Sequence, residues 1–471
     1  MSLPFRLNLF VALWCAMNAE VMAEVREPTR RPNLVLILAD DLGYGDVSCH
    51  GARDIQTPHL DTLASEGMML TRMRANCTVC SPTRAAILTG MYADRVGVPG
   101  VIRTDASNSW GYLRHDIPTL ADRLREVGYE TGIVGKWHLG LTSPNTPLER
   151  GFNHFHGFLG DMMDDYYTHR RHGQNYMRNN NAAIEPAGHA SELFTNWAVD
   201  YVSERAEHAG TPFFLYLAYN APHFPIQPPA EWLDRVQKRS PNLDPKRALN
   251  VAFVEHLDDQ IGRLMQRLDE LGLRENTVVA FTSDNGGSLP HAQNNDPWRD
   301  GKQSHYEGGL RVPCWVRYPG HIQPGSKSDH AALTFDLGAT FLQYAGAEHP
   351  DDSDAIRLKG VLEGRAQQLV ASASPRELYF VRREGGHRYV GHAYHAIIRG
   401  RWKLMQNHPF SALELYDLKA DPQETKNVFA ENPKVVADLK KRLAIHLQRG
   451  GQVPWQPGQA NVSDSAANAG R

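Results

Sequence analysis

Short apolar runs alternate with amphipathic stretches along most of the chain. Residues 34–39, 213–219 and 277–282 are mostly apolar runs, as in strands that are buried on both faces, and residues 131–134 read as a shorter strand. Helical spacing of apolar residues precedes two of these runs, at Leu120, Leu124 and Val127 and again from Val254 to Leu268. This alternation predicts an α/β fold, in which helices cover both faces of a sheet.

The pattern changes after about Gly346. Residues 351–354 have the polar composition of a linker or loop, residues 378–382 and 402–405 resemble strands, and residues 433–448 resemble a helix. We therefore expect a smaller C-terminal subdomain of antiparallel strands plus a helix. The expected division is a signal peptide at 1–23, an α/β domain at 24–350, the subdomain at 351–450 and a disordered tail at 451–471.

The first residues indicate export. Arg6 precedes an apolar stretch at residues 7–16, and Val21-Met22-Ala23 offers small residues for cleavage. The stretch is too short for an ordinary membrane-spanning helix, and cleavage is favoured over an uncleaved anchor. We expect the export machinery as a partner, a secreted or periplasmic protein (lysosomal in a eukaryote) and no stable membrane insertion. The net charge of the 471 residues is −3, which argues against a nucleic-acid partner.

Polar residues follow each expected strand at its carboxyl end, where open α/β sheets bind ligands. The residues after the four strands are Asp40-Asp41, Lys136-Trp137-His138, His223 and Asp284-Asn285. Carboxylate and amide oxygens are the ligands that hard cations prefer, so Asp40, Asp41, Asp284 and Asn285 predict a Ca²⁺ site, with Mg²⁺ second. Turn or helix-capping roles are the alternative for each pair.

The segment from Cys80 to Gly90 contains a second chemical signal. Pro82 suits the first turn of a helix, which places Cys80 just before a helix N-terminus, where free N–H groups favour an anion. Arg84 lies one turn further and adds a forked positive donor. On this chemistry alone, a buried cysteine beside a capped helix is an equal alternative.

Two motifs resemble the signatures of type I sulfatases: Cys80-Ser81-Pro82-Thr83-Arg84 with Leu88-Thr89-Gly90, and the run from Gly128 to Gly140 with Lys136 and His138. The likeness extends from about Pro32 to about Leu447. It implies an alkaline-phosphatase-like fold with a large, mixed, mostly parallel sheet. It also implies that a maturation enzyme converts Cys80 to formylglycine. Asp40, Asp41, Asp284 and Asn285 match the calcium ligands of the family, together with the modified Cys80.

The resemblance also assigns the cationic residues of the site. Arg84, Lys136, His138, His223 and Lys302 match the family's active-site residues. One hydroxyl of the hydrated aldehyde attacks sulfur and the other drives sulfate release. Arg84 steadies the hydrate, His138 assists the release, and His223 and Lys302 serve the leaving oxygen. Asp284 is the expected acceptor of the attacking hydroxyl's proton.

The substrate is predicted from residues 164–172, which combine aromatic and basic side chains. This stretch is similar to that of sulfatases acting on N-acetylgalactosamine sulfates, so a sulfated carbohydrate is favoured over a simple aryl sulfate; a polar surface loop is the alternative. Two other functions stay open. A phosphatase or phosphodiesterase of the same superfamily would bind two zinc ions, and a non-catalytic binding protein for sulfated glycans would retain an unmodified thiol.

Overall fold

The computed structural model describes residues 31–208, 210–365 and 375–456. The signal peptide expected at 1–23 and residues 457–471 of the expected tail lie outside these ranges. From Pro32 onwards the described residues form one compact unit. Within the described ranges, none of the helices has both the length and the apolarity required to span a bilayer.

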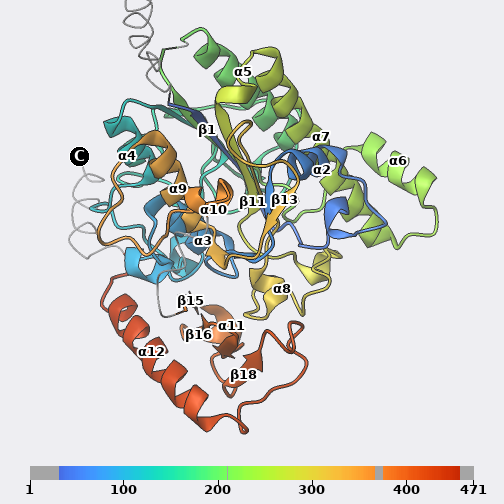
Figure 1. The fold of residues 1–471 in the computed structure, drawn as a ribbon. Coiled ribbons are helices and arrows are strands. Elements are labelled where there is room, and N and C mark those ends of the chain that lie inside the picture. Colours follow the sequence, from blue (N-terminus) through green and yellow to red (C-terminus); the bar gives the residue numbers. More distant parts are fainter. Residues whose placement is uncertain (1–30, 209, 366–374, 457–471) are drawn as a thin grey trace, which may run out of the picture. The chain divides into compact units, whose positions relative to one another are not determined.

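A ten-stranded sheet forms the centre of this unit (Figure 1). Its middle five strands are parallel, and antiparallel neighbours flank them, which confirms the expected mixed, mostly parallel sheet. The order across the sheet is β13 (Ser326–Ser328), β2 (Met68–Leu70), β12 (Cys314–Arg317), β11 (Thr277–Ser283), β1 (Asn33–Ala39), β10 (Phe213–Ala218), β4 (Glu130–Lys136), β5 (His154–Phe158), β8 (Met177–Asn179) and β9 (Ala182–Ala183).

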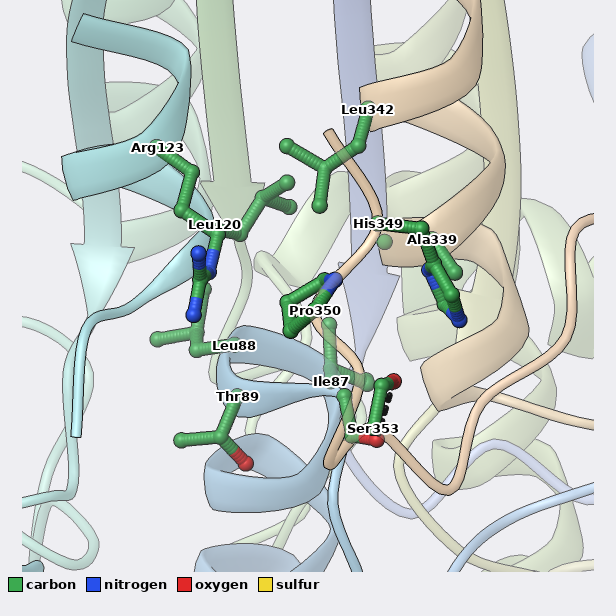
Figure 2. A pocket seen from close by; sticks show the side chains of 12 residues that line it. Ile87, Leu88, Thr89, Leu120, Arg123, Ala339, Leu342, His349, Pro350 and Ser353 are labelled. Carbon is green, nitrogen blue, oxygen red and sulfur yellow. Dashed lines mark hydrogen bonds between the residues drawn. The ribbon is translucent and has the colours of Figure 1, made fainter. Parts of the chain in front are cut away.

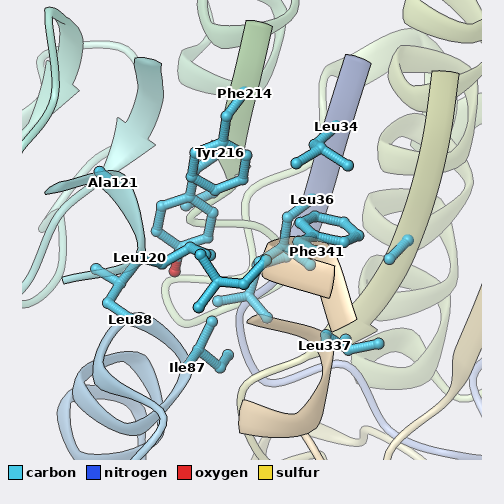
Figure 3. Close-up of a cluster of buried hydrophobic side chains, with 14 of the residues drawn as sticks. Leu34, Leu36, Ile87, Leu88, Leu120, Ala121, Phe214, Tyr216, Leu337 and Phe341 are labelled. Atoms are coloured by element: carbon cyan, nitrogen blue, oxygen red, sulfur yellow. The ribbon is translucent and has the colours of Figure 1, made fainter. Parts of the chain in front are cut away.

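Strand β1 shows why its apolar run is unbroken. Leu34 and Leu36 point into one hydrophobic core, and Val35 and Ile37 point into the core on the other face, because successive side chains of a strand alternate. The first core also contains side chains of α3 (Cys80–Thr89), α4 (Leu120–Glu126) and α9 (Phe335–Ala345), as Figure 3 shows. The second contains side chains of α2 (Pro58–Glu66), α5 (Ala190–Ala206) and α7 (Pro245–Glu270).

The apolar stripes that predicted helices lie within helices of the structure. In α4, the side chain of Thr119 accepts a hydrogen bond from the backbone N–H of Asp122, and the Asp122 carboxylate accepts one from the backbone N–H of Thr119. The stripe from Val254 to Leu268 lies within α7, on which α6 (Ala230–Arg239) packs. Gly346 ends α9 with a φ of 70°, where the expected change of pattern begins.

A second, four-stranded antiparallel sheet follows, here named the C-terminal sheet. It consists of β15 (Glu377–Arg383), β16 (Ala393–Arg399), β17 (Trp402–Met405) and β18 (Glu414–Asp417). One face packs on α12 (Pro433–Gly451), and the other packs on Tyr306, Leu310 and Phe335 of the larger part of the chain. Trp455, within the tail expected from residue 451, stacks on Trp110 with ring centroids 4.9 Å apart.

Candidate active site

Four neighbouring parallel strands end at one edge of the ten-stranded sheet. Asp40 follows β1, Lys136 is the last residue of β4, His223 lies beyond β10, and Asp284 follows β11. Because these strands run in the same direction, their carboxyl ends meet at the same edge. The structure therefore brings together side chains that are up to 244 positions apart in sequence.

Buried carboxylates and cations alternate at this edge. Lys136 forms an ion pair with Asp40, Lys302 Nζ lies 2.7 Å from a carboxylate oxygen of Asp41, and Arg84 Nη2 lies 2.8 Å from Asp284 Oδ2. Burial opposes ionisation of Asp40, but Lys136, His223 and Arg84 hold the pKa of this carboxyl well below its usual range.

Cys80 lies in the middle of these charges. It is the first residue of α3 rather than the residue before it, and only 3% of its surface is exposed. Its sulfur lies 3.9 Å from Lys302 Nζ, and it belongs to a group with Asp40, Asp41 and His223 whose ligand atoms lie within 4.8 Å of one another. Burial, followed by the charge of Asp40, raises the pKa of the Cys80 thiol, so an unmodified side chain is a poor nucleophile near neutral pH.

Two oxygen atoms at this edge are suited to a cation. Asp40 Oδ1 and Asn285 Oδ1 are buried and accept no hydrogen bond from the described residues, whereas the amide nitrogen of Asn285 donates to Asp41 Oδ1 at 2.8 Å. Burial and the neighbouring Asp40 raise the pKa of Asp284, a sign of crowded negative charge. The donor set is oxygen-rich and fits the expected Ca²⁺. Asp284 lies outside the group around Cys80, and its Oδ2 accepts a hydrogen bond from Arg84 Nε at 3.0 Å.

The two candidate histidines donate hydrogen bonds through opposite ring nitrogens. His138 Nε2 lies 2.7 Å from the carbonyl oxygen of Ile102 and must carry the proton, so the buried Nδ1 is a free acceptor. Burial and Lys136 lower the pKa of His138, so its ring is neutral. His223 Nδ1 donates to the carbonyl of Phe224 at 2.7 Å, and its Nε2 lies 3.6 Å from Asp41 Oδ2.

Lys302 lies on the loop 299–307, which the C-terminal sheet supports. Tyr394 of β16 donates to the carbonyl oxygen of Gln303 at 2.9 Å, and Asn407, just after β17, accepts from the backbone N–H of His305 at 2.6 Å. At the end of the loop, Glu307 pairs with the buried Lys403 of β17 at 3.1 Å. The position of Lys302 therefore depends on the packing between the two sheets.

Comparison with known proteins agrees with this geometry. Residues 32–347 match the family described as "Sulfatase", and residues 297–449 match the family described as "N-sulphoglucosamine sulphohydrolase, C-terminal". The first match covers more than half of the chain. This chain belongs to the sulfatase family, whose members are sulfuric ester hydrolases.

Individual sulfatases are similar over different lengths. The chain is 32% identical to N-acetylgalactosamine-6-sulfatase of Mus musculus over 68% of its own length and 64% of that enzyme's. It is 28% identical to N-acetylgalactosamine-6-O-sulfatase of Bacteroides thetaiotaomicron, over 92% of this chain and 96% of that enzyme. Among solved structures, Ps i-CgsB in complex with k-i-k-neocarrahexaose has a TM-score of 0.81 at 29% identity, covering 93% of this chain and 98% of that one. The chain thus spans just under two thirds of the mouse relative.

This sulfatase has an open cavity of about 220 Å³ beside Cys80. His138, His223 and Lys302 line it, as the sequence motifs suggested, and so do four residues that no motif indicated: Arg103, Asp161, Gln303 and Arg382. Arg382 belongs to β15, so the C-terminal sheet supplies part of the wall. Another cavity, shown in Figure 2, lies at the opposite end of α3 around Thr89 and Leu342 and contains none of the candidate catalytic residues.

Residues 164–172 contribute less to the cavity than their composition suggested. Arg171 lines it, but Tyr166 is buried, and its hydroxyl donates to the carbonyl oxygens of Asn220 and His223 at 2.8 and 2.9 Å. Tyr166 therefore supports the backbone of His223 and is not free to stack on a sugar. Its place in an aromatic, basic stretch gave no signal for this supporting role.

Proposed function

We propose that this protein hydrolyses sulfate esters of carbohydrates, with N-acetylgalactosamine-type sulfates favoured and small aryl sulfates also accepted. The catalytic residues proposed are Cys80, Arg84, Lys136, His138, His223 and Lys302. The observation that carries the proposal is the burial of Cys80 among three carboxylates and three cations at one sheet edge.

The cations provide what sulfate ester hydrolysis requires. The ester carries a negative charge that spreads over the sulfonyl oxygens in the transition state, and fixed positive groups in a site shielded from water stabilise that charge most effectively. Lys136 is fully buried and Lys302 nearly so, and both are held by carboxylates, so neither has to reorganise during the reaction. Arg84 orients Asp284 and donates to the carbonyl oxygen of Lys136 at 3.2 Å, which fixes the end of β4.

The histidines suit the two proton transfers. His138 presents an unprotonated Nδ1 in a buried position and is the proposed base for sulfate release. His223 lines the cavity with its Nδ1 bonded to Phe224, and Nε2 of its protonated form is the proposed donor to the leaving oxygen. Burial and Lys302 lower the pKa of His223, which makes its protonated form a stronger acid.

Two groups complete the proposed site. Asp40, Asp41, Asp284 and Asn285, with the modified residue 80, would hold one Ca²⁺, which supplies positive charge for the sulfonyl oxygens when bound. The hydrated formylglycine made from Cys80 by a maturation enzyme supplies the attacking hydroxyl and a second hydroxyl for sulfate release.

The choice of substrate is supported by the relatives. Both enzymes named above carry N-acetylgalactosamine in their names, and the similar solved structure is a complex with k-i-k-neocarrahexaose. For location we propose export with cleavage of residues 1–23, and for organisation a division near residue 350, where the linker expected at residues 351–354 begins.

The decisive experiment combines mass spectrometry with a substrate screen. Matured protein should contain formylglycine at position 80, bind about one calcium per chain and release sulfate from defined sulfated mono- and oligosaccharides. Two zinc ions per chain would instead support a phosphatase or phosphodiesterase. An unmodified thiol in a host that matures sulfatases, without sulfate release, would support a glycan-binding protein.

A further inference from the structure

Two arginines in the cavity wall share a single carboxylate. Arg103 Nη2 lies 2.9 Å from Glu384 Oε2, and Arg382 Nη2 lies 3.5 Å from Glu384 Oε1. Both arginines line the cavity that contains Cys80, whereas the side chain of Glu384 is only 3% exposed. Among the described residues, no other carboxylate lies within ion-pair distance of either guanidinium group.

The third arginine of the cavity wall is surrounded by more negative than positive charge. Arg171 contacts Asp161 at 3.1 Å and Asp164 at 2.7 Å, so its one positive charge faces two carboxylates. Asp161 accepts further hydrogen bonds from the backbone N–H of Met162 at 3.0 Å and from the hydroxyl of Thr104 at 3.5 Å. Arg171 therefore has no positive charge to spare, and a second anion in the cavity would be drawn to Arg103 and Arg382.

The remaining hydrogen bonds of these arginines leave room for a ligand. Arg103 Nη1 donates to the carbonyl oxygen of Asn108 at 3.0 Å. Arg382 Nη1 donates to the hydroxyl of Tyr394 at 2.7 Å and to the carbonyl oxygen of Gln303 at 3.4 Å, and Arg382 Nε is buried and donates to no described residue. A guanidinium group has five N–H donors in a fixed fork that matches a carboxylate or sulfate.

We propose that Arg103 and Arg382 bind a second anionic group of the substrate, a carboxylate or sulfate on the same or the adjoining sugar. This inference rests on the proposed function and narrows its substrate class to glycans that carry more than one negative charge. It also gives the C-terminal sheet a part in specificity, because Arg382 lies on β15 and Glu384 directly follows it.

Paired substrates test the inference. One pair is a sulfated sugar linked to a uronic acid and its carboxyl-reduced counterpart; the other is a disulfated sugar and its monosulfated counterpart. The ratio of kcat/KM within each pair measures preference for the second anion. A charge-assisted hydrogen bond that is made to only one member of a pair predicts a wild-type ratio of about 10 or more for at least one pair. The pair that shows the preference identifies the anion as carboxylate or sulfate.

Two variants should change this ratio in opposite directions. Arg103→Gln removes one cation and should lower the ratio about tenfold. Glu384→Gln keeps an oxygen that can accept from the backbone N–H of Val101 but removes the shared negative charge, so the ratio should rise severalfold. A merely structural role would reduce activity in both variants without moving the ratio. Arg170→Gln is the matched control, since Arg170 pairs with the exposed Glu185 outside the cavity.

Calorimetry with the Cys80→Ala protein separates this inference from the proposed function. Tighter binding of the doubly anionic member of a pair, weakened by Arg103→Gln, supports the inference even if no sulfate is released. A wild-type ratio near 1 for both pairs, or a fall of the ratio in Glu384→Gln, overturns it. Failure of matured protein to release sulfate from any ester contradicts the proposed function instead.

Discussion

The strand ends of the ten-stranded sheet and the loop 299–307 place the two lysines of the proposed site by different means. Lys136 is the last residue of a central strand, with bonded strands on both sides and a buried partner in Asp40. Lys302 lies on a loop that depends on hydrogen bonds from Tyr394 and Asn407, in or beside the C-terminal sheet. A residue on a central strand is fixed by the sheet itself, whereas a loop residue is only as well placed as the neighbours that hold it.

The largest effect on turnover is expected at Cys80, which lies between the strand ends and the loop. Cys80→Ala should reduce turnover of an aryl sulfate by at least about 10⁴-fold, because no other group there can supply the nucleophile. The fold should persist, since one small buried side chain replaces another. Circular dichroism and a thermal melt check this. Cys314→Ala, which removes a buried thiol on β12, is the control and should keep its activity.

Removal of the proposed Ca²⁺ should destabilise the strand ends of the ten-stranded sheet more than the loop 299–307. Without a cation, Asp40 Oδ1 and Asn285 Oδ1 stay buried and unsatisfied, so chelation should abolish turnover and lower Tm. Ca²⁺ at 100 times its Kd should restore about 2.7 kcal/mol of stability. Calorimetry in the presence of a chelator and then of added Ca²⁺ measures this. An unchanged Tm with full activity would contradict the proposed metal site.

Loosening the loop should weaken catalysis without preventing folding. Asn407→Ala removes the acceptor for the backbone N–H of His305 and for the hydroxyl of Ser304, so Lys302 should lose its fixed position. We expect kcat to fall about tenfold. Asn427→Ala is the matched control, because Asn427 accepts from Leu415 and Phe429 in the same region without touching the loop. An equal fall of kcat in the two variants would mean that Asn407 contributes only to the stability of this region.

The effect with the smallest expected consequence for turnover concerns pH and stability. Burial lowers the pKa of His305 to about 3, below the ordinary value of 6.5. As pH falls, the unfolded chain takes up this proton first, so the stabilising contribution is complete above about pH 6.5 and is lost progressively toward pH 3. Between pH 7 and 4 this single group should remove up to about 3 kcal/mol from the free energy of unfolding.

His305→Asn tests this effect. An asparagine amide can still donate to the carbonyl oxygen of Gln406, which His305 Nδ1 contacts at 3.1 Å, but it takes up no proton. Urea unfolding at several pH values should therefore show a weaker loss of stability on acidification in the variant. An equal loss in both proteins would mean that other groups cause the acid sensitivity.

Much of the fold was readable because its signals are local. The alternating burial of Leu34 and Val35 on the two faces of β1 requires an unbroken apolar run, and that run is visible without any tertiary knowledge. The helical spacing of Leu120 and Leu124, which lie in α4, is visible in the same way. The stacking of Trp455 on Trp110 is different, because a partner 345 positions away leaves no local signal in the sequence.

The sequence by itself determined which side chains end the strands, and hence that Asp40, Lys136 and Asp284 would meet, because parallel strands share one carboxyl edge. Only the tertiary structure decided what surrounds them. Arg103 comes from a loop and Arg382 from the C-terminal sheet. The hydroxyl of Tyr166, a residue of the aromatic and basic stretch, donates to the carbonyl oxygen of His223. Such contacts arise when separate segments pack together, and packing depends on shape and burial that no single segment encodes.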